Sequence, residues 1–262
     1  MKKFLITLTK TIIFFIGWAL LAGLLPIPEN NNPAIWRFWA ELIPFLCIMV
    51  LTFAFWLIEK RKTKLYLIAH PFKNSIIGVG IGLAWLGSVV VILMVLGVMR
   101  ILEYNAVSMI GVWLFSAFIN TIMQELLVRG YLYQMIKTNY NVVIAVVITT
   151  ALFTFMHGGA FEAGIIPVLN VLTMSLFMSV ILEYTQSLIA PIITHFIWNG
   201  VGAIVLGGVS LAEDYPHLLT SEFVGNVLLT GGTAKIEGSF VVFIANAILI
   251  LIFLLLIKKR SR

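Results

Sequence analysis

Apolar residues occur in eight long runs along the chain, separated by short polar segments. A helix that spans a lipid bilayer needs about 20 largely apolar residues, and each run approaches or reaches that length. The pattern predicts an all-α fold, a polytopic membrane helix bundle of about eight transmembrane helices. Because most connections are short, we expect a single membrane domain over residues 1–262. The expected spans are residues 11–27, 36–57, 75–99, 108–134, 141–157, 165–183, 187–206 and 238–257.

The composition supports solvation by lipid. Hydrophobic residues make up 61% of the 262 residues and charged residues 11%, with a mean hydropathy of +1.08. A soluble domain has roughly 25% charged residues. The net charge of +6 does not indicate a nucleic-acid partner, because the basic residues stand at the ends of the apolar runs and form no basic stripe with interleaved aromatic residues. The single cysteine, Cys47, excludes an intrachain disulfide.

The charged connections predict an orientation in the membrane. The connection 58–74 is basic, whereas 207–237 carries mainly acidic residues. Because short loops rich in Lys and Arg stay in the cytoplasm, we expect a multi-pass protein of the cell membrane with both termini cytoplasmic. Arg37 and Arg100, at outer ends of spans, are exceptions. The residues used are Lys2, Lys3, Lys10, Lys60, Arg61, Lys62, Lys64, Lys73, Lys137, Lys258, Lys259, Arg260 and Arg262 inside, and Glu213, Asp214 and Glu222 outside.

A few polar residues lie deep within the predicted spans, where they are functional candidates because charge in hydrocarbon is costly. By contrast, Glu41 and Glu183 lie near span ends, where we expect them to reach water. We expect the deep residues to line one water-accessible cavity. They are Glu125 and Arg129 on the fourth span, His157 at the end of the fifth, and His195 and Asn199 on the seventh. Gln124 lies beside them as a neutral polar partner and is a further candidate site residue.

Each of these residues also has a structural interpretation. Glu125 and Arg129 are four residues apart and can form an ion pair on one helix face. His195 and Asn199 have the same spacing and can simply hydrogen-bond to a neighbouring helix. His157 precedes two glycines and can be a histidine at a helix end. Their concentration in an otherwise apolar chain favours a site.

The residue types suit hydrolysis. A carboxylate or an imidazole can polarise a water molecule, and a second imidazole and an amide can donate hydrogen bonds to the developing oxyanion. The chain contains no His-Glu-x-x-His zinc motif, no Gly-x-Ser-Gly and no Gly-x-Gly-Asp. Two histidines and a carboxylate could bind zinc, but nothing in their spacing requires it, so no cofactor is predicted.

Three short motifs resemble one known family. They read Gln124-Glu125-Leu-Leu-Val-Arg129, Phe153-Thr-Phe-Met-His157 and His195-Phe-Ile-Trp-Asn199, the last preceded by Ser187-Leu-Ile-Ala-Pro191. In order, spacing and helical placement they are similar to the motifs of the CAAX protease and bacteriocin-processing (CPBP, or Abi) intramembrane proteases. The resemblance covers a core of about residues 108–206; outside it only hydropathy is shared.

The resemblance implies an eight-helix bundle of the CAAX prenyl protease type II kind, with a cavity open toward the cytoplasmic half of the bilayer. It implies a glutamic-type endopeptidase that cleaves a membrane-associated peptide or protein with an activated water. His157 would hold that water, and His195 with Asn199 would bind the oxyanion. Glu125 and Arg129 would be supporting residues. The family's first motif glutamate is replaced here by Gln124.

This replacement leaves the function open. A glutamine can hydrogen-bond a water but cannot accept its proton, so either Glu125 takes over, or His157 suffices, or the chain does not cleave. Neighbouring helical positions point about 100° apart, so Glu125 cannot take over without rearrangement. The alternative function is a bacteriocin self-immunity protein or a membrane scaffold. The short loops suggest a bacterial protein, for which a leader peptide or a bacteriocin precursor is the expected substrate.

Two expectations concern geometry. Counting about 1.5 Å of rise per residue places His195 on the cytoplasmic side and His157 nearer the far side. Gly78, Gly80 and Gly82 form a small-residue face on the third span, where another helix can approach closely. A small-molecule transporter is a third functional class, but the chain shows no internal repeat. The oligomeric state and the substrate's identity do not follow from the sequence.

Overall fold

The structure, a computed structural model, describes residues 2–212 and 214–260. Glu213 and Arg262, which belong to the expected charge pattern, lie outside the described residues. The chain divides into two compact units. Unit 1 comprises residues 1–67 and 111–149, and unit 2 comprises residues 68–110 and 150–262.

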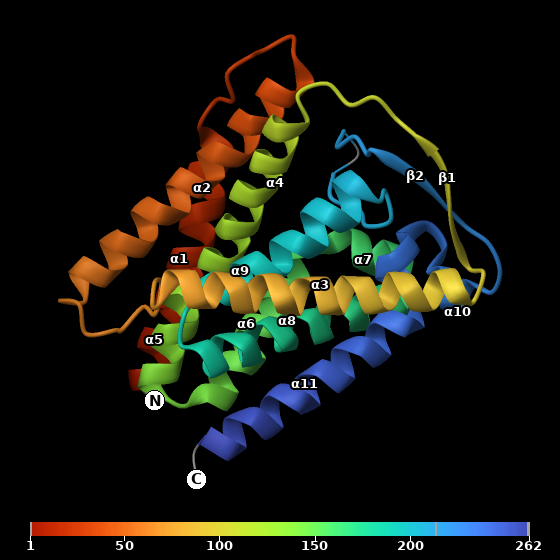
Figure 1. The fold of residues 1–262 in the computed structure, drawn as a ribbon. Coiled ribbons are helices and arrows are strands. Elements are labelled where there is room, and N and C mark those ends of the chain that lie inside the picture. Colours follow the sequence, from red (N-terminus) through yellow and green to blue (C-terminus); the bar gives the residue numbers. More distant parts are fainter. Residues whose placement is uncertain (1, 213, 261–262) are drawn as a thin grey trace. The chain divides into compact units, whose positions relative to one another are not determined.

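Unit 1 is built from α1 and α2 and from the continuous helical stretch that includes α4. Its elements are α1 (Lys2–Leu24), α2 (Pro33–Ile58), α4 (Ile110–Glu125), the π-helix η1 (Leu126–Gly130), α5 (Tyr131–Asn139) and the first half of α6 (Val142–Met156) (Figure 1). α2 starts at Asn32, whose side chain accepts a hydrogen bond from Ala34 N at 3.0 Å, with Pro33 in the first turn.

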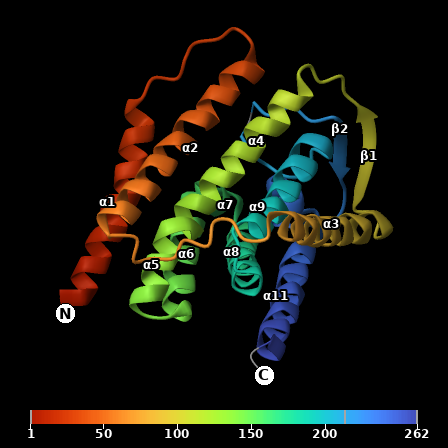
Figure 2. The ribbon, with the colours of Figure 1, turned by 60° about the vertical axis from the view of Figure 1, so that its left-hand side comes forward.

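Aromatic contacts hold the helices of unit 1 together. Phe14 of α1 packs on Phe55 of α2 with ring centroids 5.4 Å apart, and Trp18 Nε1 donates to Pro44 O at 3.1 Å, so α1 and α2 run antiparallel (Figure 2). α4 runs parallel to α2. Phe38 near the start of α2 stacks on Phe115 near the start of α4, with centroids 6.1 Å apart.

A polar cluster joins the opposite ends of these helices. Glu59, at the end of α2, accepts from Lys10 Nζ at 2.5 Å and from Tyr131 OH at 2.7 Å. Thr63 Oγ1 donates to the same carboxylate at 3.2 Å. One carboxylate therefore connects α1, α2 and α5.

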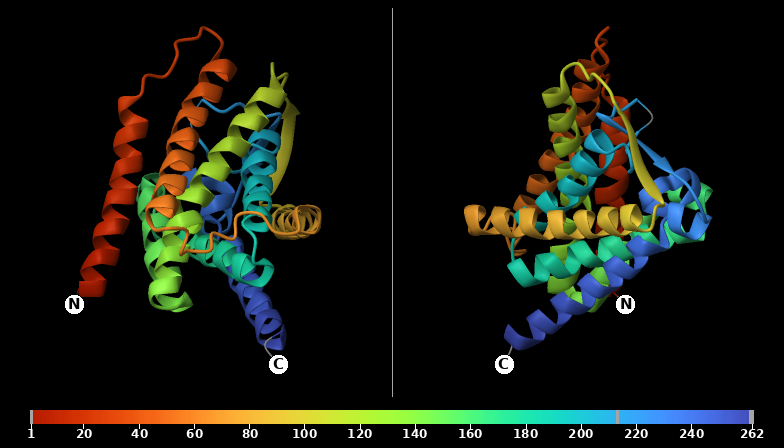
Figure 3. Two further views of the ribbon diagram at one scale, coloured as in Figure 1. Left: turned by 90° about the vertical axis from the view of Figure 1, so that its left-hand side faces the viewer. Right: turned by 45° about the vertical axis from the view of Figure 1, so that its right-hand side comes forward.

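Unit 2 contains the remaining elements. They are α3 (Pro71–Val95), β1 (Met99–Tyr104), the second half of α6, α7 (Gly158–Ala163), α8 (Ile165–Thr185), α9 (Ile189–Phe196), the π-helix η2 (Ile197–Val205), β2 (Leu219–Phe223), α10 (Val227–Thr230), the 3₁₀-helix η3 (Gly232–Gly238) and α11 (Phe240–Arg260). α8 and α11 pack along each other, and α9 crosses α3 (Figure 1, Figure 3).

A cluster of large aromatic residues forms the core of unit 2. Trp85 of α3 stacks on Trp198 of η2 with centroids 4.1 Å apart, and also meets Phe177 of α8 edge-on at 5.3 Å. Phe253 of α11 contacts Phe177 at 6.0 Å. Asn246 Nδ2 donates to a threonine of α8, which adds a buried polar link between α8 and α11.

The helices agree with a chain that crosses a membrane several times. Among the described residues, six helices are long and apolar enough to span a bilayer, and two shorter apolar helices cover residues 142–156 and 189–205. These eight segments correspond to the eight expected runs. The protein is therefore a multi-pass membrane protein with a mainly helical fold.

One element was not foreseen from the sequence. The third span was expected to reach residue 99, but α3 ends at Val95 and β1 follows after a short turn. β1 pairs antiparallel with β2, from the acidic connection, and places Arg100 opposite Glu222. Opposite charges at paired positions stabilise such a ribbon. This register also gives one of the two topologically exceptional arginines an acidic neighbour.

Candidate functional site

The first motif lies in unit 1, where α4 continues into η1. Glu125 is the last residue of α4, and Arg129 lies in η1. Arg129 Nη1 donates to Glu125 Oε2 at 2.8 Å, and both residues are 0% exposed. A buried pair of this kind is strongly destabilised when one partner is removed, because the other charge is left without compensation. The ion pair expected from their spacing is present.

Gln124 belongs to a different set of hydrogen bonds. Its Nε2 donates to Asn120 Oδ1 at 2.6 Å, and Asn120 Nδ2 donates to Glu41 Oε2, also at 2.6 Å. We call Glu41, Asn120 and Gln124 the carboxylate–amide chain. Gln124 Oε1, at its end, is buried and has no hydrogen-bond partner among the described residues.

The location expected for Glu41 was wrong. We expected it to reach water near the end of a span, but it is 6% exposed. α2 begins at Pro33, so Glu41 lies more than two turns inside the helix, where Asn120 of α4 contacts it. Arg37 Nη1 donates to Glu41 Oε1 at 3.2 Å, which gives the other exceptional arginine an acidic partner.

Sequence reasoning missed both Glu41 and Asn120 as members of this region. A weak signal was available. Arg37 and Glu41 are four residues apart, and so are Asn120 and Gln124, which places each pair on one helix face. Only the parallel packing of α2 on α4 brings the two pairs into register, and spacing within one helix does not reveal that packing.

In unit 2, His157 ends α6. Its backbone is not helical, and its Nδ1 lies 2.7 Å from Phe153 O. A carbonyl oxygen can only accept, so Nδ1 carries a proton, and Nε2 carries the lone pair whenever the ring is neutral. The expected place at a helix end is confirmed. The hydrogen bond also sets the tautomer that can take a proton from water.

The third motif approaches the same region of unit 2. His195 lies near the end of α9 and Asn199 lies in η2, and both are buried. The ring of Phe153 contacts both histidines, with its centroid 4.3 Å from that of His157 and 6.0 Å from that of His195. The structure therefore brings the second and third motifs together around one phenylalanine.

This contact corrects the depth expected from counting residues. The estimate placed His157 and His195 toward opposite sides of the bilayer, yet both rings contact Phe153. The estimate failed because α6 has only 15 residues and α9 only 8, and because α9 crosses α3 at a steep angle (Figure 3). Rise per residue gives depth only for helices that stand along the membrane normal.

The first and third motifs each span the start of a π-helix. Glu125 immediately precedes η1 and Arg129 lies within it; His195 precedes η2 by one residue and Asn199 lies within it. A π-helix bonds residue i to i+5 and so places an extra residue in the turn. Such segments are frequent at functional sites. The sequence analysis expected ordinary helix at both places.

Glycines on α3 allow α9 and η2 to lie close. A Cβ on Gly78 would lie 2.8 Å from Ala190 O, and one on Gly82 would lie 2.8 Å from Ile197 Cδ1. Thr194, next to His195, donates from Oγ1 to Gly78 O at 3.2 Å. The expected close approach is confirmed for Gly78 and Gly82. It is wrong for Gly80, whose added Cβ would meet nothing within 4 Å.

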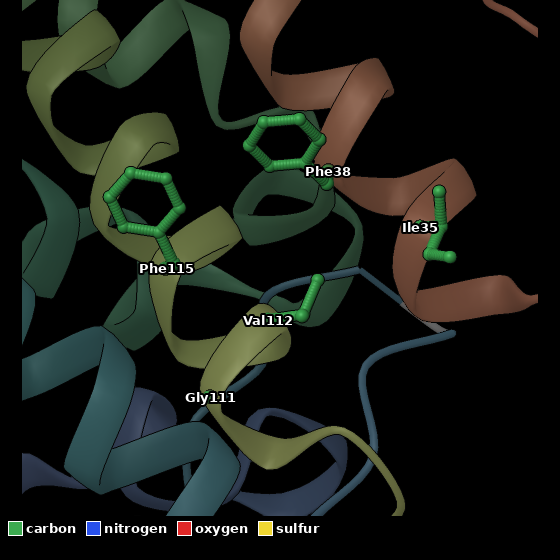
Figure 4. Close-up of a pocket in the computed structure, with 5 residues that line it drawn as sticks. All are labelled: Ile35, Phe38, Gly111, Val112 and Phe115. Atoms are coloured by element: carbon green, nitrogen blue, oxygen red, sulfur yellow. The ribbon is translucent and has the colours of Figure 1, made fainter.

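A pocket of about 400 Å³ lies in unit 1 between the starts of α2 and α4 (Figure 4). Its lining is entirely apolar, with Phe38 and Phe115 on either side. The other lining residues are Ile35, Gly111 and Val112. A pocket without polar side chains can hold an apolar group, but it offers nothing that could polarise a water or a carbonyl.

The possible zinc ligands were also considered. Within each unit, the described His, Cys, Asp and Glu side chains form no group of three that could hold a metal ion. The sequence did not require such a site.

Comparison with known proteins gives one family match. The chain matches the family described as "Type II CAAX prenyl endopeptidase Rce1-like" over residues 106–201. No curated protein and no solved structure matches the chain. The matched residues include all six candidates from Gln124 to Asn199, but not Glu41. The similarity to the Rce1-like type II CAAX prenyl endopeptidase family therefore covers residues 106–201.

Proposed function

We propose that the protein is an intramembrane endopeptidase that cleaves a membrane-associated peptide or protein with an activated water. Its Rce1-like domain supports this reaction class. The observation that carries the proposal is the hydrogen bond from His157 Nδ1 to Phe153 O. With Nδ1 donating, Nε2 is the basic atom whenever the imidazole is neutral, and a general base requires that state.

Each candidate residue has a role in this proposal. His157 Nε2 takes a proton from water while the oxygen attacks the peptide carbonyl, and the protonated ring then gives that proton to the leaving amine. His195 and Asn199 donate hydrogen bonds to the oxyanion. The Glu125–Arg129 pair holds the turn at the junction of α4 and η1.

Of the two possible bases, the contacts favour His157 over Glu125. Glu125 accepts a 2.8 Å hydrogen bond from a buried arginine, so its Oε2 is already engaged in an ion pair. Gln124 contributes a hydrogen-bond acceptor, since its Oε1 is buried and has no partner within the described part of the chain. We therefore expect slow but measurable cleavage.

The test uses the purified protein in proteoliposomes with a synthetic library of membrane-inserting peptides, read by mass spectrometry. The library should contain leader-like peptides and farnesylated peptides that end in Cys-aliphatic-aliphatic-X, because the substrate class is open. Cleavage products that appear with the wild type and vanish with His195→Ala support the proposal. Products that persist in His195→Ala come from a contaminant and argue against it.

A non-catalytic role, as a bacteriocin self-immunity protein or a membrane scaffold, is the second candidate. One observation favours it: Gln124 cannot accept a proton where the related family has a glutamate. This candidate predicts that library peptides bind without cleavage, and that His195→Ala binds them equally well.

We also propose that both termini are cytoplasmic. The basic connections support this, and the two exceptional arginines each have an acidic neighbour, Glu41 for Arg37 and Glu222 for Arg100. In a Cys47→Ser background, a membrane-impermeant thiol reagent should label Glu222→Cys in intact cells and reach Lys62→Cys only after permeabilisation. The reverse pattern would contradict this orientation.

A further inference from the structure

The carboxylate–amide chain contains a buried carboxylate outside the three motifs. Glu41 lies in a membrane-spanning helix, and its carboxylate accepts from Arg37 Nη1 and from Asn120 Nδ2. A carboxylate inside a span is expensive unless it is paired, so such a residue is a functional candidate. The chain leads from Glu41 through one amide to Gln124, the residue that replaces the family's first motif glutamate.

The chemistry of the hydrogen bonds fixes their direction. An ionised carboxylate only accepts, so Asn120 must turn its NH₂ group toward Glu41 and its carbonyl oxygen toward Gln124. Gln124 must then donate from Nε2, which leaves Oε1 as its outward group. This accounting assigns both amide orientations, which electron density alone rarely distinguishes.

The remaining atom is therefore an acceptor. Gln124 Oε1 is buried and has no partner among residues 2–212 and 214–260. Each N–H that donates toward Glu41 polarises its amide, and a polarised amide has a more strongly accepting carbonyl oxygen. Without Glu41, Gln124 could equally turn its NH₂ group outward and would then repel a donor.

We propose that Glu41, acting through Asn120, is a positioning residue that makes Gln124 present a carbonyl oxygen to the O–H of the attacking water. The catalytic part of this inference rests on the proposed function. The fixed direction of the hydrogen bonds along the carboxylate–amide chain, which we call its wiring, does not. The carboxylate–amide chain thus keeps the accepting half of the missing glutamate's role.

The same wiring limits which residue can stand at position 124. With Gln124→Glu alone, carboxylates would stand at both ends of the chain, and Asn120 can turn its NH₂ to only one of them. Its Oδ1 would then face the other carboxylate, acceptor against acceptor. With Glu41→Gln added, the amide at 41 donates to Asn120 Oδ1, and Asn120 Nδ2 donates to the carboxylate at 124. The chain accommodates a carboxylate at either end but not at both.

A double-mutant cycle tests the wiring without any substrate. The wild type, Glu41→Gln, Gln124→Glu and the double variant are purified in detergent, and their thermal unfolding midpoints are compared. Gln124→Glu should lower the midpoint by a few degrees in the wild-type background. Adding Glu41→Gln to this variant should restore most of that loss. Equal destabilisation in both backgrounds, including failure of both to fold, would overturn the proposal.

Glu59→Gln provides the matched control. Glu59 is also a paired carboxylate on the same helix, 18 positions and therefore about 27 Å farther along α2. Its own substitution should lower the midpoint, but its effect and that of Gln124→Glu should add. If Glu59→Gln coupled to Gln124→Glu as strongly as Glu41→Gln does, the coupling would reflect a general response to lost charge. That result would overturn the wiring.

Activity separates the wiring from the proposed function. On a peptide that the wild type cleaves, Glu41→Gln should lower kcat and leave KM unchanged, since the water acts in the chemical step, and Glu41→Asp should recover part of kcat. The double variant should exceed Gln124→Glu in turnover. If Glu41→Gln instead raised KM and left kcat unchanged, the positioning role would be overturned. If the unfolding cycle shows coupling but no variant cleaves, the wiring stands and the peptidase function fails.

Discussion

In unit 1 the buried polar side chains bond to one another, whereas in unit 2 the two histidines lie around an aromatic ring. Glu125 is held by Arg129, and Gln124 is held by Asn120. His157 and His195 instead contact Phe153, and His157 Nδ1 also donates to the backbone carbonyl of that residue. This contrast fits the proposed function, in which the residues of unit 1 support the site and His157 of unit 2 transfers the proton.

The largest expected effect comes from removing the imidazole of His157. Proton transfer by a positioned base contributes roughly 10²–10⁴-fold, so His157→Ala should lower the turnover of a cleaved peptide by about that factor. The measurement is the initial rate in proteoliposomes at matched protein content. His70→Asn is the control, because His70 is exposed and makes no side-chain cap hydrogen bond. A variant of His157 that keeps full activity would end the assignment of the base.

The next effect concerns the ion pair of unit 1. Arg129→Met should destabilise the protein by about 3–5 kcal/mol, because it leaves the Glu125 carboxylate buried without its partner. Adding Glu125→Gln should recover most of that loss. Unfolding midpoints in detergent measure both. If the double variant is no more stable than Arg129→Met, the pair is not the source of the stability, and the contrast between the units weakens.

A smaller effect tests how unit 2 holds His195. Gly78→Ala would place a Cβ 2.8 Å from a backbone oxygen of α9, so it should destabilise by about 1–3 kcal/mol. Gly80→Ala meets nothing within 4 Å and should stabilise α3 by about 0.5–1 kcal/mol. Thermal unfolding of both variants gives the comparison. Equal shifts in one direction would mean that α9 is not held by close contact with α3.

Hydropathy located the spans well because the cost of exposing polar groups to lipid leaves long apolar runs. It placed the end of the third span too late in the chain, because the start of the segment Met99–Tyr104 is as apolar as the end of a helix. These residues in fact pair with Leu219–Phe223. Strand pairing joins residues more than a hundred positions apart, and no local pattern reports it. The π-helices were missed for a related reason: a single extra residue in a turn does not change the apolar pattern.

The motif residues could be found from the sequence because each stands out in an apolar run. Their surroundings could not. Glu41 and Glu183 were both expected to reach water near a span end, yet Glu41 is buried and contacts Asn120 from another helix. The expectation that Glu125, Arg129, His157, His195 and Asn199 line one cavity stays a prediction.

The stacked pair Trp85 and Trp198 has a practical consequence. Two indole rings 4.1 Å apart and tilted by 17° share their electronic excitation, which gives a characteristic near-ultraviolet circular dichroism band. Trp198 directly precedes Asn199 in η2, so any movement of this segment against α3 changes that band. The protein thus carries an intrinsic optical reporter beside its candidate oxyanion-binding residue, and peptide binding can be followed without attaching a dye.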